Sequence, residues 1–128
     1  MTVSQAGAGH FTPDDLPVDE AVFGELRTFG AEFMSRLLGL YVSETESRLR
    51  ELRDAVALAD APAVASIAHN IRGSCGLLGG RRLAAACARL ERSATAGGLF
   101  GSANDLRQIE IEHEELCRAL TQRVTTIA

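Results

Sequence analysis

Apolar side chains recur every three or four positions along most of this 128-residue chain. This spacing predicts amphipathic α-helices, because a helix turns about 100° per residue and gathers such positions on one face. No segment alternates apolar and polar residues in the way that a half-buried strand does. The pattern therefore favours an all-α protein.

Glycines, prolines and capping aspartates divide the periodic sequence into separate helices. Five helices are expected, at about residues 20–28, 31–58, 61–78, 82–96 and 102–126. Four long helices joined by short turns predict an antiparallel up-down-up-down four-helix bundle, with the short additional N-terminal helix covering one end. Residues 1–17 carry Gly, Ser, Thr and two prolines, so we expect a flexible N-terminal tail followed by one domain over 18–128.

The apolar positions also predict which side chains form the core. In the 31–58 helix, the expected buried face consists of Phe33, Leu37, Leu40, Tyr41, Leu49, Leu52 and Val56. In the 61–78 helix, it consists of Val64, Ile67, Ile71, Ser74, Cys75 and Leu78.

Composition narrows the class of protein. The net charge is −4 and acidic and basic residues are interspersed, so a nucleic-acid footprint is not expected. No apolar run approaches the roughly 18 residues of a membrane span, and no secretory signal is recognisable. The three cysteines are an odd number within apparent helices, which indicates reduced thiols. We therefore expect a cytoplasmic protein, and a monomer whose helices bury one another.

His69 lies almost opposite the apolar stripe of its helix, among small residues that include Gly73 and Gly76. A solvated histidine is the usual explanation for such a position. However, glycine inside a helix costs about 1 kcal/mol relative to alanine. Its use twice on the outer face suggests that another molecule approaches this histidine closely. Arg72 lies one turn further along on the same face.

A longer motif surrounds this histidine, and in order it reads Ala68-His69-Asn70-Ile71-Arg72-Gly73-Ser74-Cys75, then Leu78-Gly79, Leu83, Cys87 and Leu90-Glu91. It resembles the histidine phosphotransfer (HPt) domain, and the resemblance extends over about residues 18–126. Two positions depart slightly from the family pattern: Arg72 stands where lysine is commoner, and Ile71 where leucine is commoner. Both replacements are chemically close.

The resemblance implies a phosphocarrier without kinase or phosphatase activity of its own. His69 would accept a phosphoryl group and donate it again, shuttling it between receiver-domain aspartates in a two-component phosphorelay. The partners would be response-regulator receiver domains and a hybrid sensor histidine kinase. The chain would need no cofactor of its own, because the receiver supplies Mg²⁺. A neutral imidazole nitrogen is a competent nucleophile toward phosphorus, which agrees with this role.

Further residues are candidates for the same site. A guanidinium can contact phosphoryl oxygens, so Arg72 is expected to hold the phosphoryl group. Gly73 would leave room for the phosphate and the partner, and Glu91 on the next helix could orient the imidazole. Partner contacts are expected around the histidine, at Ala65, Ser66, Asn70 and Gly76.

Two alternatives stay open at this stage. The chain could be a helical adaptor that binds receivers or a kinase without being phosphorylated. It could also be the excised phosphate-accepting domain of a larger hybrid or chemotaxis kinase. A metal site is not expected: His113 and Cys117 share a helix face at i, i+4 spacing, but no second pair of ligands accompanies them.

Overall fold

The computed structural model describes residues 16–127, so the predicted tail lies almost wholly outside the described residues. In chain order the elements are α2 (Glu20–Leu26), the 3-10 turn η2 (Arg27–Phe29), α3 (Ala31–Ala57), α4 (Ala61–Leu77), α5 (Arg81–Thr95) and α6 (Ser102–Ile127). The predicted helices agree with these bounds to within about two residues. The all-α class is therefore confirmed.

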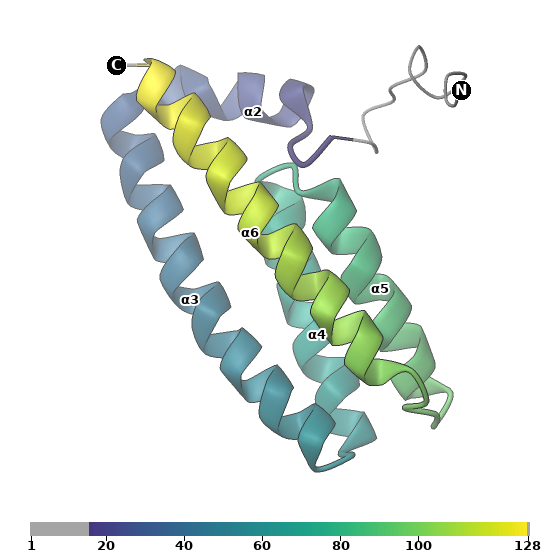
Figure 1. Cartoon of the computed structure of the whole chain (residues 1–128). Coiled ribbons are helices and arrows are strands. Elements are labelled where there is room, and N and C mark those ends of the chain that lie inside the picture. The colour runs from purple at the N-terminus through teal and green to yellow at the C-terminus, as the bar shows by residue number, and fades with distance from the viewer. Residues whose placement is uncertain (1–15, 128) are drawn as a thin grey trace, which may run out of the picture.

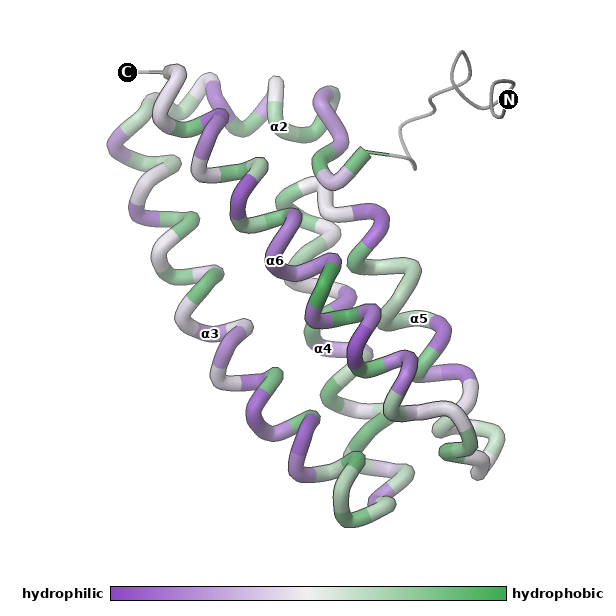
Figure 2. Tube along the Cα trace, in the orientation of Figure 1, coloured by the Kyte–Doolittle hydropathy of each residue, from purple (hydrophilic) through white to green (hydrophobic). Residues whose placement is uncertain are grey.

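The four long helices form an antiparallel up-down-up-down bundle, and α2 lies across the end where α3 begins and α6 ends (Figure 1). Helix α4 packs most closely against α5, and α3 and α6 complete the bundle. The predicted four-helix bundle with a short additional N-terminal helix is confirmed. The amphipathic pattern that favours this bundle is visible along each long helix, where hydrophobic and hydrophilic positions alternate with the helical period (Figure 2).

Local chemistry explains where the helices begin. The side chain of Asp19 accepts a hydrogen bond from the Ala21 N–H, and Asp60 accepts one from the Ala63 N–H at 3.2 Å. Both are N-caps that satisfy N–H groups left free in a first helical turn. Gly30 separates α2 from α3 with a φ of 94°, a conformation that favours glycine.

Polar contacts attach α2 to the rest of the bundle. The Asp19 N–H donates to the Gly79 carbonyl, and Arg81 Nε donates to Asp19 Oδ2, both at 2.7 Å. Arg123 on α6 pairs with Glu20. The short helix is thus tied both to the α4–α5 turn and to the last helix.

The bundle interior is filled by aliphatic side chains from all four long helices, including the fully buried Leu52, Ile71, Leu90 and Leu116. One part of the predicted core is wrong. Phe33 and Leu40 are 44% and 58% exposed, because α3 turns Met34 and Thr45 inward instead, beside the correctly predicted Tyr41.

Two polar residues of α6, Glu112 and His113, lie in the interior although their side chains can carry charge. Arg82 of α5 pairs with Glu112 at 3.0 Å.

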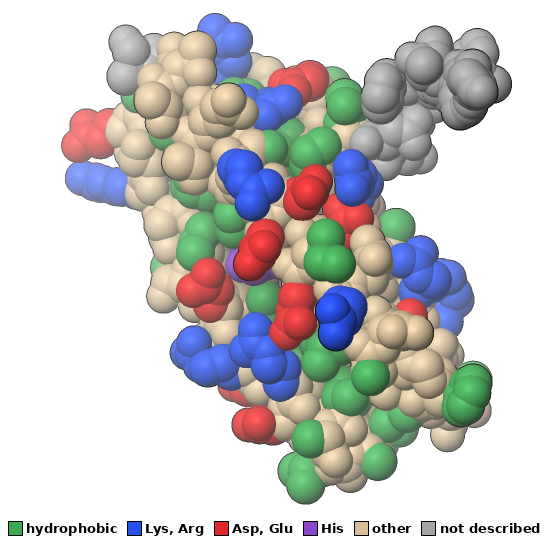
Figure 3. Space-filling model, viewed as in Figure 1, with side chains coloured by type: hydrophobic (Ala, Val, Ile, Leu, Met, Phe, Trp, Pro, Cys, Tyr) green, Lys and Arg blue, Asp and Glu red, His purple; other side chains and the backbone are tan. Residues whose placement is uncertain are grey.

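On the outer surface, acidic and basic side chains intermix over the face formed by α6 and α3 (Figure 3). Within residues 16–127, no helix is both long enough and apolar enough to cross a membrane.

Candidate functional site

His69 lies near the middle of α4 and points away from the core. Its side chain is 61% exposed, whereas Ala68 and Ile71 on the opposite side are fully buried. The outward orientation predicted from the helical pattern is therefore correct.

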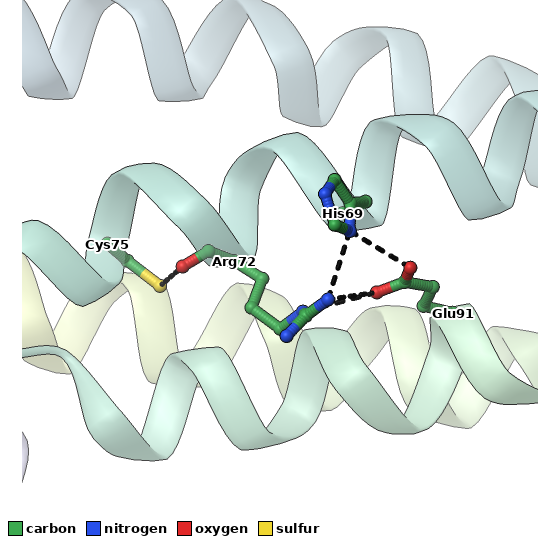
Figure 4. Close-up of polar contacts among 4 residues, drawn as sticks. All are labelled: His69, Arg72, Cys75 and Glu91. Carbon is green, nitrogen blue, oxygen red and sulfur yellow. Dashed lines mark hydrogen bonds and ion pairs between the residues drawn. The ribbon is translucent and has the colours of Figure 1, made fainter.

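Three polar side chains meet at this point, two from α4 and one from α5. His69 Nδ1 lies 3.0 Å from Glu91 Oε2 and also 3.0 Å from Arg72 Nη2. Arg72 Nε and Nη2 each lie 3.1 Å from Glu91 Oε1 (Figure 4). The structure thus brings together three residues that the sequence identified separately. We refer to His69, Arg72 and Glu91 as the triad.

The contacts of Nδ1 indicate which imidazole nitrogen carries the proton. A carboxylate only accepts hydrogen bonds and a guanidinium only donates them. Nδ1 would therefore have to be a donor toward Glu91 but an acceptor toward Arg72. Arg72 already has Glu91 Oε1 as an acceptor, whereas Glu91 Oε2 needs a donor. We therefore assign the proton to Nδ1, which donates to Glu91. Nε2 then holds the free lone pair.

The packing of α4 against α5 positions the triad. On α5, Leu90 is fully buried, and the adjacent Glu91 consequently emerges at the edge that faces α4. Arg72 follows His69 by three residues, which places both side chains on neighbouring turns of one helix face. The side chain of Glu91 is only 23% exposed, so its charge is partly shielded from water.

The other candidate residues surround the imidazole on the outer side of α4. Gly73 and Gly76 are exposed, and a Cβ added to either would meet no atom within 4 Å. Ser66 and Asn70 are exposed as well, and Ala65 is half-buried. The glycines therefore serve no close packing inside this chain, in agreement with the predicted open space beside His69.

Two hollows near the site were missed by the sequence reasoning. A groove of about 390 Å³ runs between α3 and α4, and its apolar lining includes Phe33, Leu37, Leu40 and Leu77. A second groove, of about 530 Å³, adjoins Arg72 and Glu91. Leu77, an apolar residue outside the predicted buried face of its helix, was the signal that could have revealed the first groove.

In the described part of the chain, the three cysteines form no hydrogen bond with a side chain of the triad, although Cys75 Sγ donates to the Arg72 carbonyl at 3.4 Å (Figure 4). Cys75 and Cys87 are buried free thiols, and burial raises the pKa of Cys75 to about 12. Cys117 Sγ lies 3.6 Å from His113 Nε2, and burial raises the pKa of this thiol to about 11. Among residues 16–127, no three His, Cys, Asp or Glu side chains are grouped as metal ligands.

Comparison with known proteins agrees with this geometry. The model of the Hpt domain family matches residues 36–124, a range that contains the whole triad. The crystal structure of histidine-containing phosphotransfer protein B from Pseudomonas aeruginosa is similar to this chain, with a TM-score of 0.81 and 28% identity. The alignment covers 88% of this chain and 97% of that one. A search of curated proteins found no match.

The family match extends over more than half of the chain and includes the exposed histidine. The similar fold extends over nearly the whole length of a phosphotransfer protein. The chain therefore belongs to the Hpt domain family, the histidine phosphotransfer proteins of phosphorelays.

Proposed function

We propose that this chain carries a phosphoryl group on Nε2 of His69 between receiver-domain aspartates. The observation that supports the proposal most directly is the exposed imidazole whose Nδ1 is held by Glu91 at 3.0 Å. This contact leaves Nε2 as the nucleophilic nitrogen and turns it toward an approaching partner. The chain would act as a cytoplasmic monomer.

The transfer step follows from this tautomer. The Nε2 lone pair attacks the phosphorus of an aspartyl phosphate, a P–N bond forms, and the P–O bond to the aspartate breaks. The bonding electrons leave with the aspartate carboxylate. The ring gains positive charge, which the adjacent Glu91 carboxylate stabilises while Nδ1 keeps its proton. The reverse sequence returns the phosphoryl group to a second aspartate.

Arg72 and Gly73 have complementary roles in this proposal. The Arg72 guanidinium contacts both triad partners and is 40% exposed, so it can also donate to phosphoryl oxygens next to the ring. Gly73, one turn beyond His69, keeps the approach to the imidazole free of side-chain atoms. Glu91 would orient the ring rather than react.

The partner would contribute the remaining chemistry. In this proposal the receiver provides the aspartate and Mg²⁺, and the chain binds no cofactor of its own. Response-regulator receivers and a hybrid sensor histidine kinase would dock over Ser66, Asn70, Gly76 and the small Ala65 on α4. The apolar groove along Phe33, Leu40 and Leu77 offers adjacent hydrophobic surface for the same contact. The chain would be a phosphocarrier without kinase or phosphatase activity.

The decisive experiment measures transfer from a radiolabelled, phosphorylated receiver domain with Mg²⁺ to the wild-type chain and to His69→Gln. We expect label on the wild type alone, labile in acid and stable in base as phosphohistidine is. Circular dichroism would verify that the variant is folded. Label on the folded His69→Gln variant would place the acceptor elsewhere. An unlabelled wild type that still binds receivers would favour the adaptor alternative.

A further inference from the structure

The groove of about 530 Å³ beside the triad is lined by both small apolar and charged side chains. Besides Arg72 and Glu91, it is lined by Ala88, Arg92 and Thr95 of α5 and by Ala96 directly after this helix. Arg92 is exposed at the side of this groove. A partner that docks on His69 therefore meets a second guanidinium close to Arg72.

Helices α4 and α5 differ in charge from the rest of the molecule. Together they contain five arginines and a single acidic residue, Glu91, whereas the whole chain has a net charge of −4. The remainder of the chain therefore has a net charge of −8. By contrast, the face over α6 and α3 mixes both signs (Figure 3). The phosphoacceptor thus lies on the basic part of an acidic protein.

Most of the arginine charge on these two helices is matched within the molecule. Arg72 pairs with Glu91, Arg81 with Asp19 and Arg82 with Glu112. Both oxygens of Glu91 are already occupied by the other two members of the triad. Among residues 16–127, no carboxylate forms an ion pair with Arg92, so its charge is available to a partner.

The expected partner has the complementary charge. Mg²⁺ is held in proteins through carboxylates, so a receiver that supplies Mg²⁺ and a phosphorylated aspartate presents acidic side chains at its transfer site. Building on the proposed function, we propose that Arg92 is a specificity-determining residue. Its guanidinium forms an ion pair with a carboxylate at the rim of the docked receiver. Arg92 affects the rate of association with the receiver and the choice among receivers, whereas the triad contacts the phosphoryl group.

Charge reversal tests this role. With the receiver that transfers fastest to the wild type as the probe, Arg92→Glu should lower kcat/KM about 5- to 10-fold at low ionic strength. At about 1 M salt the difference should shrink below about 2-fold, because the Debye length falls to about 3 Å. Arg92→Lys keeps the charge and should stay within about 2-fold of the wild type. Transfer at saturating receiver should change little.

The matched control is Arg107→Glu, an equal change in net charge in the hollow between α3 and α6. Equal losses from both reversals, a salt-independent loss, or a loss in Arg92→Lys as large as in Arg92→Glu would each overturn the proposal. Phosphoramidate, a small phosphodonor that needs no docking, separates this inference from the proposed function. It should label Arg92→Glu and the wild type equally at His69. If it labels neither, the phosphocarrier proposal itself fails.

Discussion

Glu91 Oε2 lies 3.0 Å from His69 Nδ1, although the two residues are 22 positions apart and belong to different helices. The state of the imidazole therefore depends on the packing of α5 against α4. The buried Ile71 and Leu90 fix this packing from within. The packing of Ile71 and Leu90 in the core thus also determines the hydrogen bond at His69 Nδ1.

We expect Glu91→Ala to slow phosphoryl transfer about 10- to 100-fold at saturating receiver, because the ring loses a charge-assisted hydrogen bond worth about 1.5–3 kcal/mol. Glu91→Gln keeps an oxygen that accepts from Nδ1–H and should lose less. Single-turnover kinetics give the rates, and imidazole ¹⁵N chemical shifts report the tautomer. Unchanged kinetics in Glu91→Ala, with an unchanged tautomer, would remove Glu91 from the mechanism.

Gly73 should tolerate larger side chains in the isolated protein but not in its complex. An added Cβ meets no atom within 4 Å, so Gly73→Ala should raise the free energy of unfolding by about 0.5–1 kcal/mol. Gly73→Leu should fold equally well yet lower kcat/KM for transfer by at least about 10-fold, because its side chain fills the approach to His69. Urea unfolding and transfer assays test the two halves separately.

Gly39 provides the control for this substitution. It is an exposed glycine on α3 with no atom near an added Cβ, and it faces the α3–α6 side of the bundle. Gly39→Leu should leave transfer within about 2-fold of the wild type. Similar losses from both leucine variants would mean that Gly73 has no special place in docking.

The sequence predicted the local features of the site well. His69 and Arg72 are three residues apart on one helix, so helical periodicity alone places them on one outer face. The helix bounds were equally accessible, because Asp19, Gly30 and Asp60 act on the neighbouring backbone. The position of Glu91 beside the ring, in contrast, followed from the family resemblance and not from periodicity.

Features that depend on how helices rotate against one another escaped prediction. Phe33 and Leu40 fit the apolar stripe of α3, but the bundle buries Met34 and Thr45 instead. The groove beside Arg92 likewise exists only once α4 and α5 are packed. A helical pattern gives the spacing of side chains along one face, and the neighbouring helices decide which face is buried.

Gly80 should be among the glycines most sensitive to substitution. A Cβ added there would lie 2.6 Å from Leu116 Cδ2 and 3.2 Å from the Cys75 carbonyl oxygen, in a fully packed interior. We expect Gly80→Ala to lower the free energy of unfolding by about 1–3 kcal/mol through overpacking. Urea denaturation measures the loss. Gly76→Ala is the control, because the added Cβ is unobstructed there, and it should not destabilise the fold. Equal free energies of unfolding for the two variants would contradict the packing argument.

Buried His113 should make stability depend on pH in the mildly acidic range. Burial lowers the pKa of this histidine below its ordinary value of 6.5, against the opposing attraction of Glu46 at 3.8 Å. The folded chain therefore binds a proton less readily than the unfolded chain. Stability should be complete above pH 6.5 and should fall as the pH drops below that value toward the lower folded-state pKa.

Carboxylates affect stability in a different pH window. Burial raises the pKa of Asp19, but hydrogen bonds from Ala21 and Arg81 outweigh it, and Arg123 lowers the pKa of Glu20. Their contributions are lost only as the pH falls below about 4. Urea midpoints from pH 5 to 8 thus isolate His113, and His113→Leu and His113→Gln should both flatten the profile. If the wild type and both variants decline in parallel over this range, the slope arises elsewhere and His113 is protonated as easily in the fold as in the unfolded chain.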